Sequence, residues 1–318
     1  MFKTYDFMGK RKIFISISLF LITISLFSIF TKGFNWGIDF KGGIEVQVKF
    51  EKKVDIADIR KLISKKFKSA NITTFGSDNE FLIRLNVDNV SSNIQKSIGV
   101  EIKNILKELG EVEIRRVDIV GAKVGNELKE KGIKALIFAV IGILIYVSFR
   151  FEWRFALAAI LALIHDTIIS LGAVSFFNIE VNLDVLAALL TLMGYSLNDT
   201  IVVFDRIREE VKISKTKDLS MLINIAISKT LSRTILTSLT TFFVILTLYL
   251  FGGEIIKPFS FTLLVGIIVG TYSSIFIASP LLIWLGFKIE DYRKKLAQKE
   301  KIKQEKERLR KMYEGGVV

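Results

Sequence analysis

The sequence contains no cysteine, one histidine and two prolines among its 318 residues. The absence of cysteine excludes disulfide bonds, thiolate zinc sites, iron–sulfur clusters and a cysteine nucleophile. A single histidine is too few for the multi-histidine sites that hold catalytic metals. We therefore expect a protein that is not an enzyme and that holds no metal ion and no organic cofactor.

Acidic residues are fewer than basic ones: 32 Asp and Glu stand against 45 Lys and Arg, which gives a formal net charge of +13. In a soluble protein this excess would suggest nucleic acid as a partner. The basic residues instead flank apolar runs, with Lys10, Arg11 and Lys12 before the first run and eleven Lys and Arg residues within 288–311 after the last. This placement is typical of membrane topology signals, and we expect no nucleic-acid partner.

Apolar residues make up 51% of the chain and are concentrated in long blocks. At about 1.5 Å per residue, blocks of this length cross a hydrocarbon core of about 30 Å as helices. The six runs lie at 13–30, 133–149, 155–177, 185–204, 235–251 and 259–285. The sequence therefore predicts a polytopic α-helical membrane protein with six transmembrane helices in the lipid bilayer.

The short connections between the runs differ in charge. Arg150 and Arg154 lie between the second and third runs, and seven Lys and Arg residues lie within 205–234. The connection 178–184 holds no Lys or Arg, and the next one on that side holds only Lys257. By the positive-inside rule, both termini lie in the cytoplasm. No small-x-small cleavage site follows the first run, which we interpret as an uncleaved anchor rather than a secretory signal.

A polar segment of about 100 residues separates the first two runs and is too long for a loop without structure of its own. Its pattern predicts strands at 44–50, 72–76, 80–87 and 112–119 and helices at 55–67 and 92–109. This β-α-β-β-α-β order is that of a ferredoxin-like α+β domain, which would be extracytoplasmic. Asp55 and either Ser91 or Ser92 are candidate N-caps of its helices.

The chain thus divides into four expected parts. These are a cytoplasmic N-terminus with the first transmembrane helix (1–32), the extracytoplasmic domain (33–132), the bundle of the remaining transmembrane helices (133–287) and a basic cytoplasmic tail (288–318). The tail mixes Lys, Arg, Glu and Gln with few apolar residues. It is either a solvated helix beside the anionic leaflet or a contact site for the ribosome or the translocon, and both interpretations stay open.

Ionisable and amide side chains occur where lipid is expected. His165 and Asp166 lie in the middle of the third run, Asn198 and Asp199 lie in the fourth, and Arg233 lies two residues before the fifth. A charge at the bilayer centre costs about 2.5–3.5 kcal/mol on insertion scales, so such residues mark ion pathways or are paired. They are the candidate functional residues of the chain.

The predicted orientation puts Asp199 and Arg233 in the cytoplasmic half of neighbouring helices, where they could meet. An aspartate beside an arginine keeps its charge, and the same aspartate in an apolar setting without the arginine takes up a proton. The pair is therefore a candidate proton switch. The alternative is a static ion pair, with His165 and Asp166 bonded to each other or to the backbone and with Arg233 extended towards the interface.

Paired aspartates in a membrane also occur in intramembrane aspartyl proteases, in which the two acids share a proton. Asp199 lacks the Gly-x-Gly-Asp context of those enzymes, and Pro280 lies outside a Pro-Ala-Leu motif. We therefore do not expect proteolytic activity.

Glycines provide places where helices can approach closely. Gly266 and Gly270 form a Gly-x-x-x-Gly pair, and Gly194 is a further small residue in the fourth run. The approaching helix can belong to this chain or to another subunit.

Longer motifs follow one another along the chain. They are Gly-Ile-Asp-Phe-Lys-Gly-Gly at 37–43, Phe-Arg-Phe-Glu-Trp-Arg-Phe at 149–155, His-Asp at 165–166, Gly-Tyr-Ser-Leu-Asn-Asp-Thr-Ile-Val-Val-Phe-Asp-Arg-Ile-Arg-Glu at 194–209, Ser-Arg-Thr-Ile-Leu-Thr-Ser at 232–238 and Leu-Tyr-Leu-Phe-Gly-Gly at 248–253. On these motifs the chain resembles the SecD/SecF family of protein-export membrane proteins, within the resistance-nodulation-division superfamily.

The resemblance implies a subunit of the Sec protein-export machinery in the bacterial inner membrane that, with SecD, uses the proton motive force to assist polypeptide translocation. The implied coupling ion is a proton, with sodium as the alternative. The implied partners are SecD, the SecYEG translocon with YajC and YidC, and the unfolded polypeptide in transit. The other functions that stay open are a scaffold subunit that stabilises the translocon and an exporter of small molecules, which shares the architecture.

The resemblance also implies roles for individual residues. Asp199 and Arg233 match the family's membrane proton pathway, which Asp166, His165 and Asn198 would join. Structural or coupling roles are implied for a second set of motif residues: Gly37, Asp39, Gly42, Gly43, Asp205, Arg206, Arg208 and Glu209. Six helices are half of a twelve-helix transporter, so the complete pathway would need the SecD half. Protonation of Asp199 is then expected to shift the last helices and to swing the outer domain.

Overall fold

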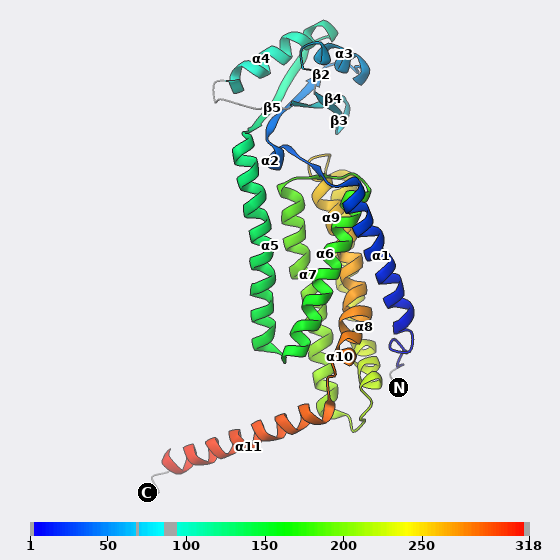
Figure 1. Cartoon of the computed structure of the whole chain (residues 1–318), viewed down its shortest axis with the longest axis vertical. Helices are drawn as coiled ribbons and strands as arrows, with labels where there is room; N and C mark the ends of the chain where they lie inside the picture. Colours follow the sequence, from blue (N-terminus) through cyan, green and yellow to red (C-terminus); the bar gives the residue numbers. More distant parts are fainter. Residues whose placement is uncertain (1–2, 68–69, 86–93, 315–318) are drawn as a thin grey trace.

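The structure is a computed structural model that describes residues 3–67, 70–85 and 94–314. Figure 1 shows a bundle of long helices with an α+β domain at one end and a single helix projecting from the other. The N-terminus and the start of the projecting helix lie at the same end of the bundle, which we call the terminal end. The opposite end, next to the α+β domain, is called the domain end.

Within the described residues, the α+β domain (residues 43–120) is a four-stranded antiparallel sheet with two helices packed on one face. Its elements are β2 (Gly43–Phe50), α3 (Ile56–Lys66), β3 (Asn71–Phe75), β4 (Ser77–Leu85), α4 (Ile94–Leu106) and β5 (Val112–Val120). The strand order across the sheet is β3-β4-β2-β5. Asp55 caps α3 as predicted, since its carboxylate accepts a hydrogen bond from the Ala57 backbone N–H at 2.8 Å. Ser91 and Ser92 lie outside the described residues.

The alternation of side chains along β2 separates the two faces of the sheet. Ile44, Val46 and Val48 are buried beneath the helices, whereas Glu45 and Gln47 between them point to the opposite face. The helix residues of this core are Ile59, Ile63, Ile98, Ile102 and Leu106. The face with Glu45 and Gln47 is turned towards the helix bundle, where it lines a polar cavity.

In the part of the chain that the structure describes, six helical spans are long and apolar enough to cross a membrane. They are α1 (Arg11–Lys32), α5 (Ala122–Arg150), α6 (Trp153–Phe176), α7 (Leu183–Ile213), α8 (Leu219–Phe251) and a last span formed by α9 (Lys257–Ser273), a π-helical segment (Ser274–Ala278) and α10 (Ser279–Trp284). The six apolar runs of the sequence each correspond to one of these spans.

Helices α5 and α8 are longer than the runs that predicted them. α5 starts at Ala122 rather than at 133, within the segment assigned to the domain, and α8 starts at Leu219 rather than at 235. The difference arises because a charged residue ends an apolar run but does not end a helix. Lys and Glu, which are good helix formers, fill the start of α5, and Lys229 and Arg233 lie within α8. Arg233, which we expected just before the fifth transmembrane helix, therefore lies inside α8.

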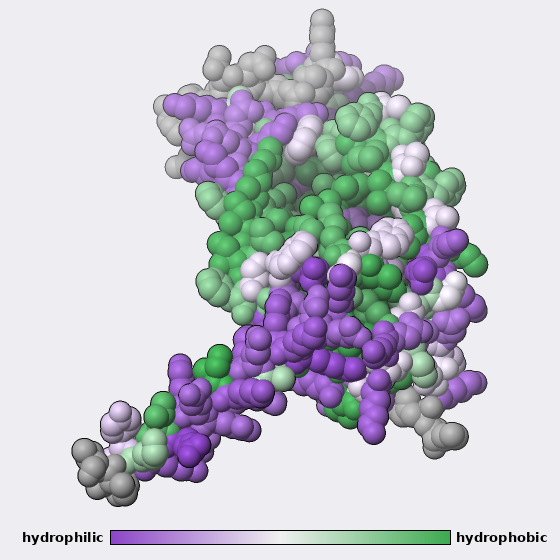
Figure 2. Space-filling model, turned by 60° about the horizontal axis from the view of Figure 1, so that its bottom comes forward, coloured by the Kyte–Doolittle hydropathy of each residue, from purple (hydrophilic) through white to green (hydrophobic). Residues whose placement is uncertain are grey.

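The six spans differ in how much of their surface is buried within the chain. α6, α7 and α9 form the centre of the bundle, whereas α1, α5 and α8 present most of their apolar residues outwards. Figure 2 shows the resulting apolar belt, bounded at the terminal end by hydrophilic residues. A belt of exposed apolar residues around a helix bundle is the surface that faces lipid tails.

The terminal end is held together by polar contacts between segments far apart in the sequence. The backbone N–H groups of Phe7 and Met8 both donate to Asn224 Oδ1 of α8 at 2.9 Å. The projecting helix, α11 (Ile289–Glu314), is attached by its first turn, where Arg293 Nε donates to the Val211 carbonyl of α7 at 2.8 Å. The rest of α11 extends away from the bundle (Figure 1).

Candidate functional site in the helix bundle

Asp166 lies at the junction of three central helices. Its side chain, on α6, is 1% exposed. One carboxylate oxygen lies 2.8 Å from His165 Nδ1. The other accepts hydrogen bonds from Ser196 Oγ of α7 at 2.5 Å and from Ser273 Oγ of α9 at 2.8 Å. Asp166 therefore joins α6, α7 and α9 through a single carboxylate.

His165 and Asp166 are bonded to each other, as one of the two interpretations of the sequence expected. The other ring nitrogen of His165, Nε2, is buried without a hydrogen-bond partner among the described residues. The ring stacks on Tyr272 of α9, with ring centroids 6.3 Å apart. A buried polar atom without a partner is unusual and calls for an explanation, such as a functional role or a bound water.

Asp199 is the second buried aspartate, 2% exposed on α7. Its carboxylate accepts a hydrogen bond from Ser238 Oγ of α8 at 3.1 Å. Ser238 Oγ in turn accepts one from Thr271 Oγ1 of α9 at 2.7 Å. A chain of hydroxyl groups thus connects Asp199 through α8 to α9.

Asp199 and Arg233 do not touch in this conformation, so the predicted pair is not formed in it. No ion pair or hydrogen bond joins their side chains among the residues described, and Arg233 is exposed on the surface of α8. Ser238, which donates a hydrogen bond to Asp199, lies five residues after Arg233 on α8. This spacing corresponds to a rotation of about 140° around the helix axis. Sequence position identified the right helices but not the faces that they turn towards each other.

Asn198 lies next to Asp199 in the sequence but on the outside of the bundle. A step of one residue turns an α-helix by about 100°, and Asn198 is accordingly exposed while Asp199 is buried. Gly194, one turn earlier, is exposed too, and nothing lies within 4 Å of the position that a Cβ would take there. Asn198, Gly194 and Arg233 therefore belong to the outer surface of α7 and α8.

Gly266 and Gly270 pack inside the chain. A Cβ at Gly266 would lie 2.6 Å from the Leu192 side chain, and one at Gly270 would lie 3.0 Å from Ser196 Cβ. Both glycines let α9 approach α7 closely, which brings Ser273 within reach of Asp166. Both glycines of this Gly-x-x-x-Gly pair therefore face a helix of the same chain.

Four hydroxyl residues complete the site and were missed in the sequence: Ser196, Ser238, Thr271 and Ser273. Hydroxyl groups are common in membrane helices, where they usually bond to the carbonyl one turn earlier. These four residues could not be singled out in the sequence, because only the fold shows which serine and threonine side chains turn towards a carboxylate.

The glycine motif after α1 fastens that segment to the starts of two other helices. Asp39 lies in the short helix α2 (Ile38–Lys41), and its Oδ2 accepts a hydrogen bond from the Leu183 N–H, at the start of α7, at 2.9 Å. Gly42 has φ +77°, and a Cβ there would lie 2.7 Å from the Ala122 backbone at the start of α5. Gly43 has φ +147° and would meet the Leu85 carbonyl at 2.9 Å. Glycine is required at both positions.

Gly37 makes room for a contact between the domain and the bundle. Strand β1 (Asn35–Trp36) pairs in parallel with β6 (Glu180–Val181), in the connection between α6 and α7. A Cβ at Gly37 would lie 2.7 Å from the Glu180 carboxylate. That carboxylate lies 2.7 Å from Arg84 Nη1 of β4, and Arg84 Nε lies 2.6 Å from Glu45. Burial raises the pKa of Glu180 above its ordinary value, although the Arg84 charge acts in the opposite direction.

The remaining motif residues form ion pairs at the terminal end. Asp205 lies 3.1 Å from Arg150, at the end of α5, and 3.3 Å from Arg208. Arg206 lies 2.6 Å from Glu209. The Asp205–Arg150 pair joins the end of α5 to α7, whereas the other two pairs lie within α7.

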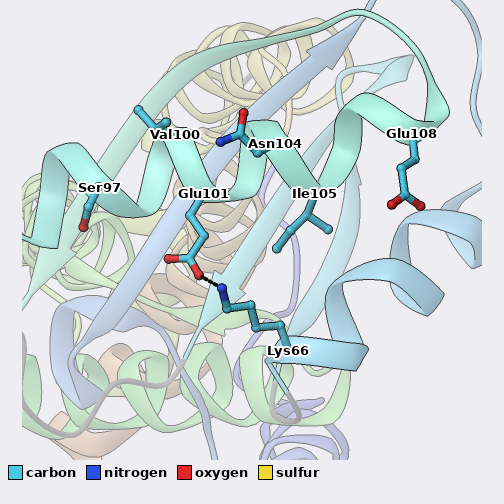
Figure 3. Close-up of a pocket in the computed structure, with 7 residues that line it drawn as sticks. All are labelled: Lys66, Ser97, Val100, Glu101, Asn104, Ile105 and Glu108. Atoms are coloured by element: carbon cyan, nitrogen blue, oxygen red, sulfur yellow. Dashed lines mark ion pairs between the residues drawn. The ribbon is translucent and has the colours of Figure 1, made fainter.

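A shallow groove between α3 and α4 lies apart from all these residues. Figure 3 shows its lining, in which Lys66 and Glu101 form an ion pair beside Val100 and Ile105. It contains none of the residues singled out in the sequence. Nor do the described residues contain any cluster of three or more His, Cys, Asp or Glu side chains able to hold a metal ion.

Two family models match the chain. The one described as "Protein export membrane protein SecD/SecF, C-terminal" matches residues 101–288, and "SecD/SecF GG Motif" matches residues 27–54. The first range contains both buried aspartates, and the second contains Gly37, Gly42 and Gly43.

Proteins of similar sequence are named protein translocase subunit SecF. The one from Helicobacter pylori is 50% identical over 98% of this chain and 97% of its own length. The one from Calditerrivibrio nitroreducens is 52% identical over 87% of this chain and 92% of its own length. The one from Vibrio alginolyticus is 46% identical over 94% and 95%.

Two solved structures have the same fold. The crystal structure of SecDF, a translocon-associated membrane protein, from Thermus thermophilus matches with a TM-score of 0.79 at 37% identity, over 89% of this chain and 39% of that one. SecDF in a super-membrane-facing form matches with a TM-score of 0.66 at 35% identity, over 94% and 40%. The chain spans about two fifths of these SecDF chains. In sequence and in fold, this multi-pass membrane protein belongs to the SecF branch of the SecD/SecF family of protein-export membrane proteins.

Proposed function

We propose that the chain, together with SecD, couples the proton motive force to the translocation of polypeptides across the bacterial cytoplasmic membrane. The observation that carries the proposal is the burial of Asp166 and Asp199 among the central helices of an apolar bundle. Carboxylates inside a membrane are costly and occur where proteins move ions or protons. The chain is then a motor subunit without a catalytic residue or a cofactor.

The proposal includes an orientation. Basic residues at the terminal end, such as Arg150, Arg206 and Arg293, support a cytoplasmic location of that end and of both termini by the positive-inside rule. The α+β domain is then extracytoplasmic, where it can act on the emerging polypeptide. The strand order β3-β4-β2-β5, with α3 after β2 and α4 after β4, supports a ferredoxin-like domain.

The surface with Asn198, Gly194 and Arg233 supports a membrane partner. An exposed amide and an exposed guanidinium are costly against lipid tails, and Gly194, one turn before Asn198 on α7, allows close helix contact. We propose that SecD covers this surface and completes the proton pathway. The wider partners are the SecYEG translocon with YajC and YidC, and the unfolded polypeptide.

The proposed cycle uses the distance between Asp199 and Arg233. In the present conformation Asp199 accepts a hydrogen bond from Ser238, and no cation among the described residues forms an ion pair with it, which suits a proton-loaded carboxyl group. Approach of the Arg233 side chain would expel the proton. One elementary charge crossing 100 mV releases about 2.3 kcal/mol, which is comparable to the free energy that biases a two-state domain movement.

A scaffold is the second candidate function, and the surroundings of Asp166 favour it. That carboxylate is bonded to three partners on three helices, as a static structural group would be. In this case the charged residues would only hold the bundle and its partners together.

The test is ion flux through the chain and SecD in vesicles. We expect Asp199→Asn and Arg233→Met to abolish proton flux while the complex with SecD stays intact. Flux of the unmodified protein driven by a sodium gradient would identify sodium as the coupling ion. Thr247→Ala is a matched control on α8, since its hydroxyl donates only to the Phe243 carbonyl of its own helix. Unchanged flux with a dissociated complex would favour the scaffold.

A further inference from the structure

Three consecutive residues of α9 contact three different parts of the bundle. Thr271 Oγ1 donates to Ser238, the hydrogen-bond partner of Asp199. Ser273 Oγ donates to Asp166. Between them, the Tyr272 hydroxyl donates to the Phe14 carbonyl of α1 and lies 3.0 Å from Ser18 Oγ of the same helix. One short stretch of α9 therefore touches the surroundings of both buried aspartates and the first helix.

The helix changes its geometry directly after this stretch. Residues Ser274–Ala278 are π-helical, and Ser279 Oγ donates to the Ser274 carbonyl at 3.1 Å. A π-helical turn holds one more residue than an α-helical turn, and such turns occur often at functional sites. Moving this extra residue along the helix would turn the residues between its old and new positions by about 100°. The stretch 271–273 therefore lies beside a point at which the helix can change its register.

Helix α1 is suited to respond to such a change. Its buried residues are Ser18, Ser25 and Ser28, and most of the rest faces outwards. Near the domain end, Ser28 Oγ lies 3.1 Å from Ser175 Oγ of α6, which donates to the Gly33 carbonyl at 2.7 Å. Near the terminal end, α1 is held by Tyr272. α1 also packs along α6, where Gly172 leaves room for Ser25, and Phe14 stacks on Phe276 of the π-helical segment. Its hydrogen bonds to α9 are made through Tyr272.

The chain runs from α1 directly into the glycine motif. Gly33 ends α1, and β1 and α2 follow before strand β2 of the α+β domain begins at Gly43. A tilt of α1 about its contact with Ser175 would therefore be passed to the segment that leads into the domain.

We propose that Tyr272 is the positioning residue that transmits the state of the two buried aspartates to α1 and through α1 to the α+β domain. The inference rests on the proposed function, because it assigns the mechanical link of the same proton-driven cycle. Its specific content is that the Tyr272 hydroxyl couples proton movement to domain movement without taking part in proton movement.

The test is the Tyr272→Phe variant of the full chain with SecD in vesicles. Proton flux is measured together with the distance between spin labels at Lys61→Cys, in the domain, and Ile255→Cys, in the connection before α9. The absence of native cysteine makes both labels selective. We expect the variant to keep its flux, to lose the pH-dependent change in distance and to lose stimulation of export about tenfold.

Tyr195→Phe is the matched control, because the Tyr195 hydroxyl is buried without a hydrogen-bond partner among the described residues. It should behave like the unmodified chain. Ser18→Ala removes one of the two partners of the Tyr272 hydroxyl on α1 and leaves the Phe14 carbonyl and α9 intact, so it should weaken the change in distance without altering flux.

Each other outcome overturns the inference. A normal change in distance in Tyr272→Phe would show that the hydroxyl transmits nothing, and a loss of flux would place it in the proton path instead. Equal effects of Tyr272→Phe and Tyr195→Phe would indicate general loosening of the bundle. Absence of flux in the unmodified chain is the distinct result that would end the proposed function and this inference with it.

Discussion

The guanidinium of Arg84 in the α+β domain lies 2.7 Å from the carboxylate of Glu180, in the connection between α6 and α7. The same guanidinium lies 2.6 Å from Glu45 in the neighbouring strand. All three side chains are largely buried. Arg84 is therefore an ionic link between the domain and the bundle, in addition to the chain connections through β1 and α5.

Arg84→Gln should loosen the domain without unfolding the bundle. The substitution leaves two largely buried carboxylates without their cation, at a cost of about 1–3 kcal/mol in the free energy of docking. Spin labels at Lys61→Cys and Ile255→Cys would report a broader distribution of distances. Arg115→Gln is the control, since the Arg115–Glu113 pair is exposed and contributes little. An unchanged distribution in Arg84→Gln would show that other contacts hold the domain.

Docking of the domain should depend on pH through Glu180. Burial raises the pKa of Glu180 above its ordinary value of 4.5 in the docked state, so the docked state binds the proton more tightly than the free one. Protonated Glu180 therefore favours docking of the domain below pH 4.5. This contribution to the free energy of docking is lost as the pH rises through the raised pKa of Glu180. The same labels measured over this range should show the trend, and Glu180→Gln should remove it. A trend of opposite sign would mean that Arg84 outweighs burial.

Asp166→Ala should destabilise the bundle. It leaves the hydroxyl groups of Ser196 and Ser273 and the Nδ1 of His165 buried without their partner, at about 2–4 kcal/mol in the free energy of unfolding. Thermal unfolding in detergent is the measurement. Thr191→Ala, at an exposed position of α7, should have little effect, because its hydroxyl donates only to the Ala187 carbonyl. Equal thermal stability of the two variants would contradict a role of Asp166 in joining α6, α7 and α9.

Gly42→Ala should separate the glycine motif from α5. The alanine would have to adopt φ +77°, with its Cβ 2.7 Å from the Ala122 backbone, and we expect a loss of about 1–3 kcal/mol in the free energy of unfolding. Gly142→Ala, in the middle of α5 with open space around it, should be neutral or stabilising because alanine is the better helix former. Thermal unfolding of the two variants compares them directly, and a stable Gly42→Ala protein would contradict the close approach.

The transmembrane helices could be predicted because an apolar block must be long enough to cross lipid, and length is visible in a sequence. The start of α8 could not, because Lys229 and Arg233 interrupt the apolar sequence between Leu219 and the predicted run. Arg233 was for this reason placed at the membrane boundary instead of inside a helix. The strands of the α+β domain were predicted by the alternation seen in Ile44, Val46 and Val48.

The site was predicted only in its ionisable members. Asp166 and Asp199 stand out because a carboxylate is rare in an apolar block, and His165 is the only histidine. Their partners Ser238 and Ser273 do not stand out, and which face a helix turns inwards depends on packing across the bundle. Helix rotation, which a sequence does not contain, is what separates Ser238 from Arg233 on α8.

The most direct test of the proton switch is the response of export to a proton gradient in cells or vesicles that carry Asp199→Asn. Asparagine keeps the size of the side chain and an oxygen that accepts from Ser238 but cannot exchange a proton, so the variant should assemble with SecD as usual. We predict that its export no longer rises when the gradient is applied. Export that stays fully sensitive to the gradient would contradict the switch.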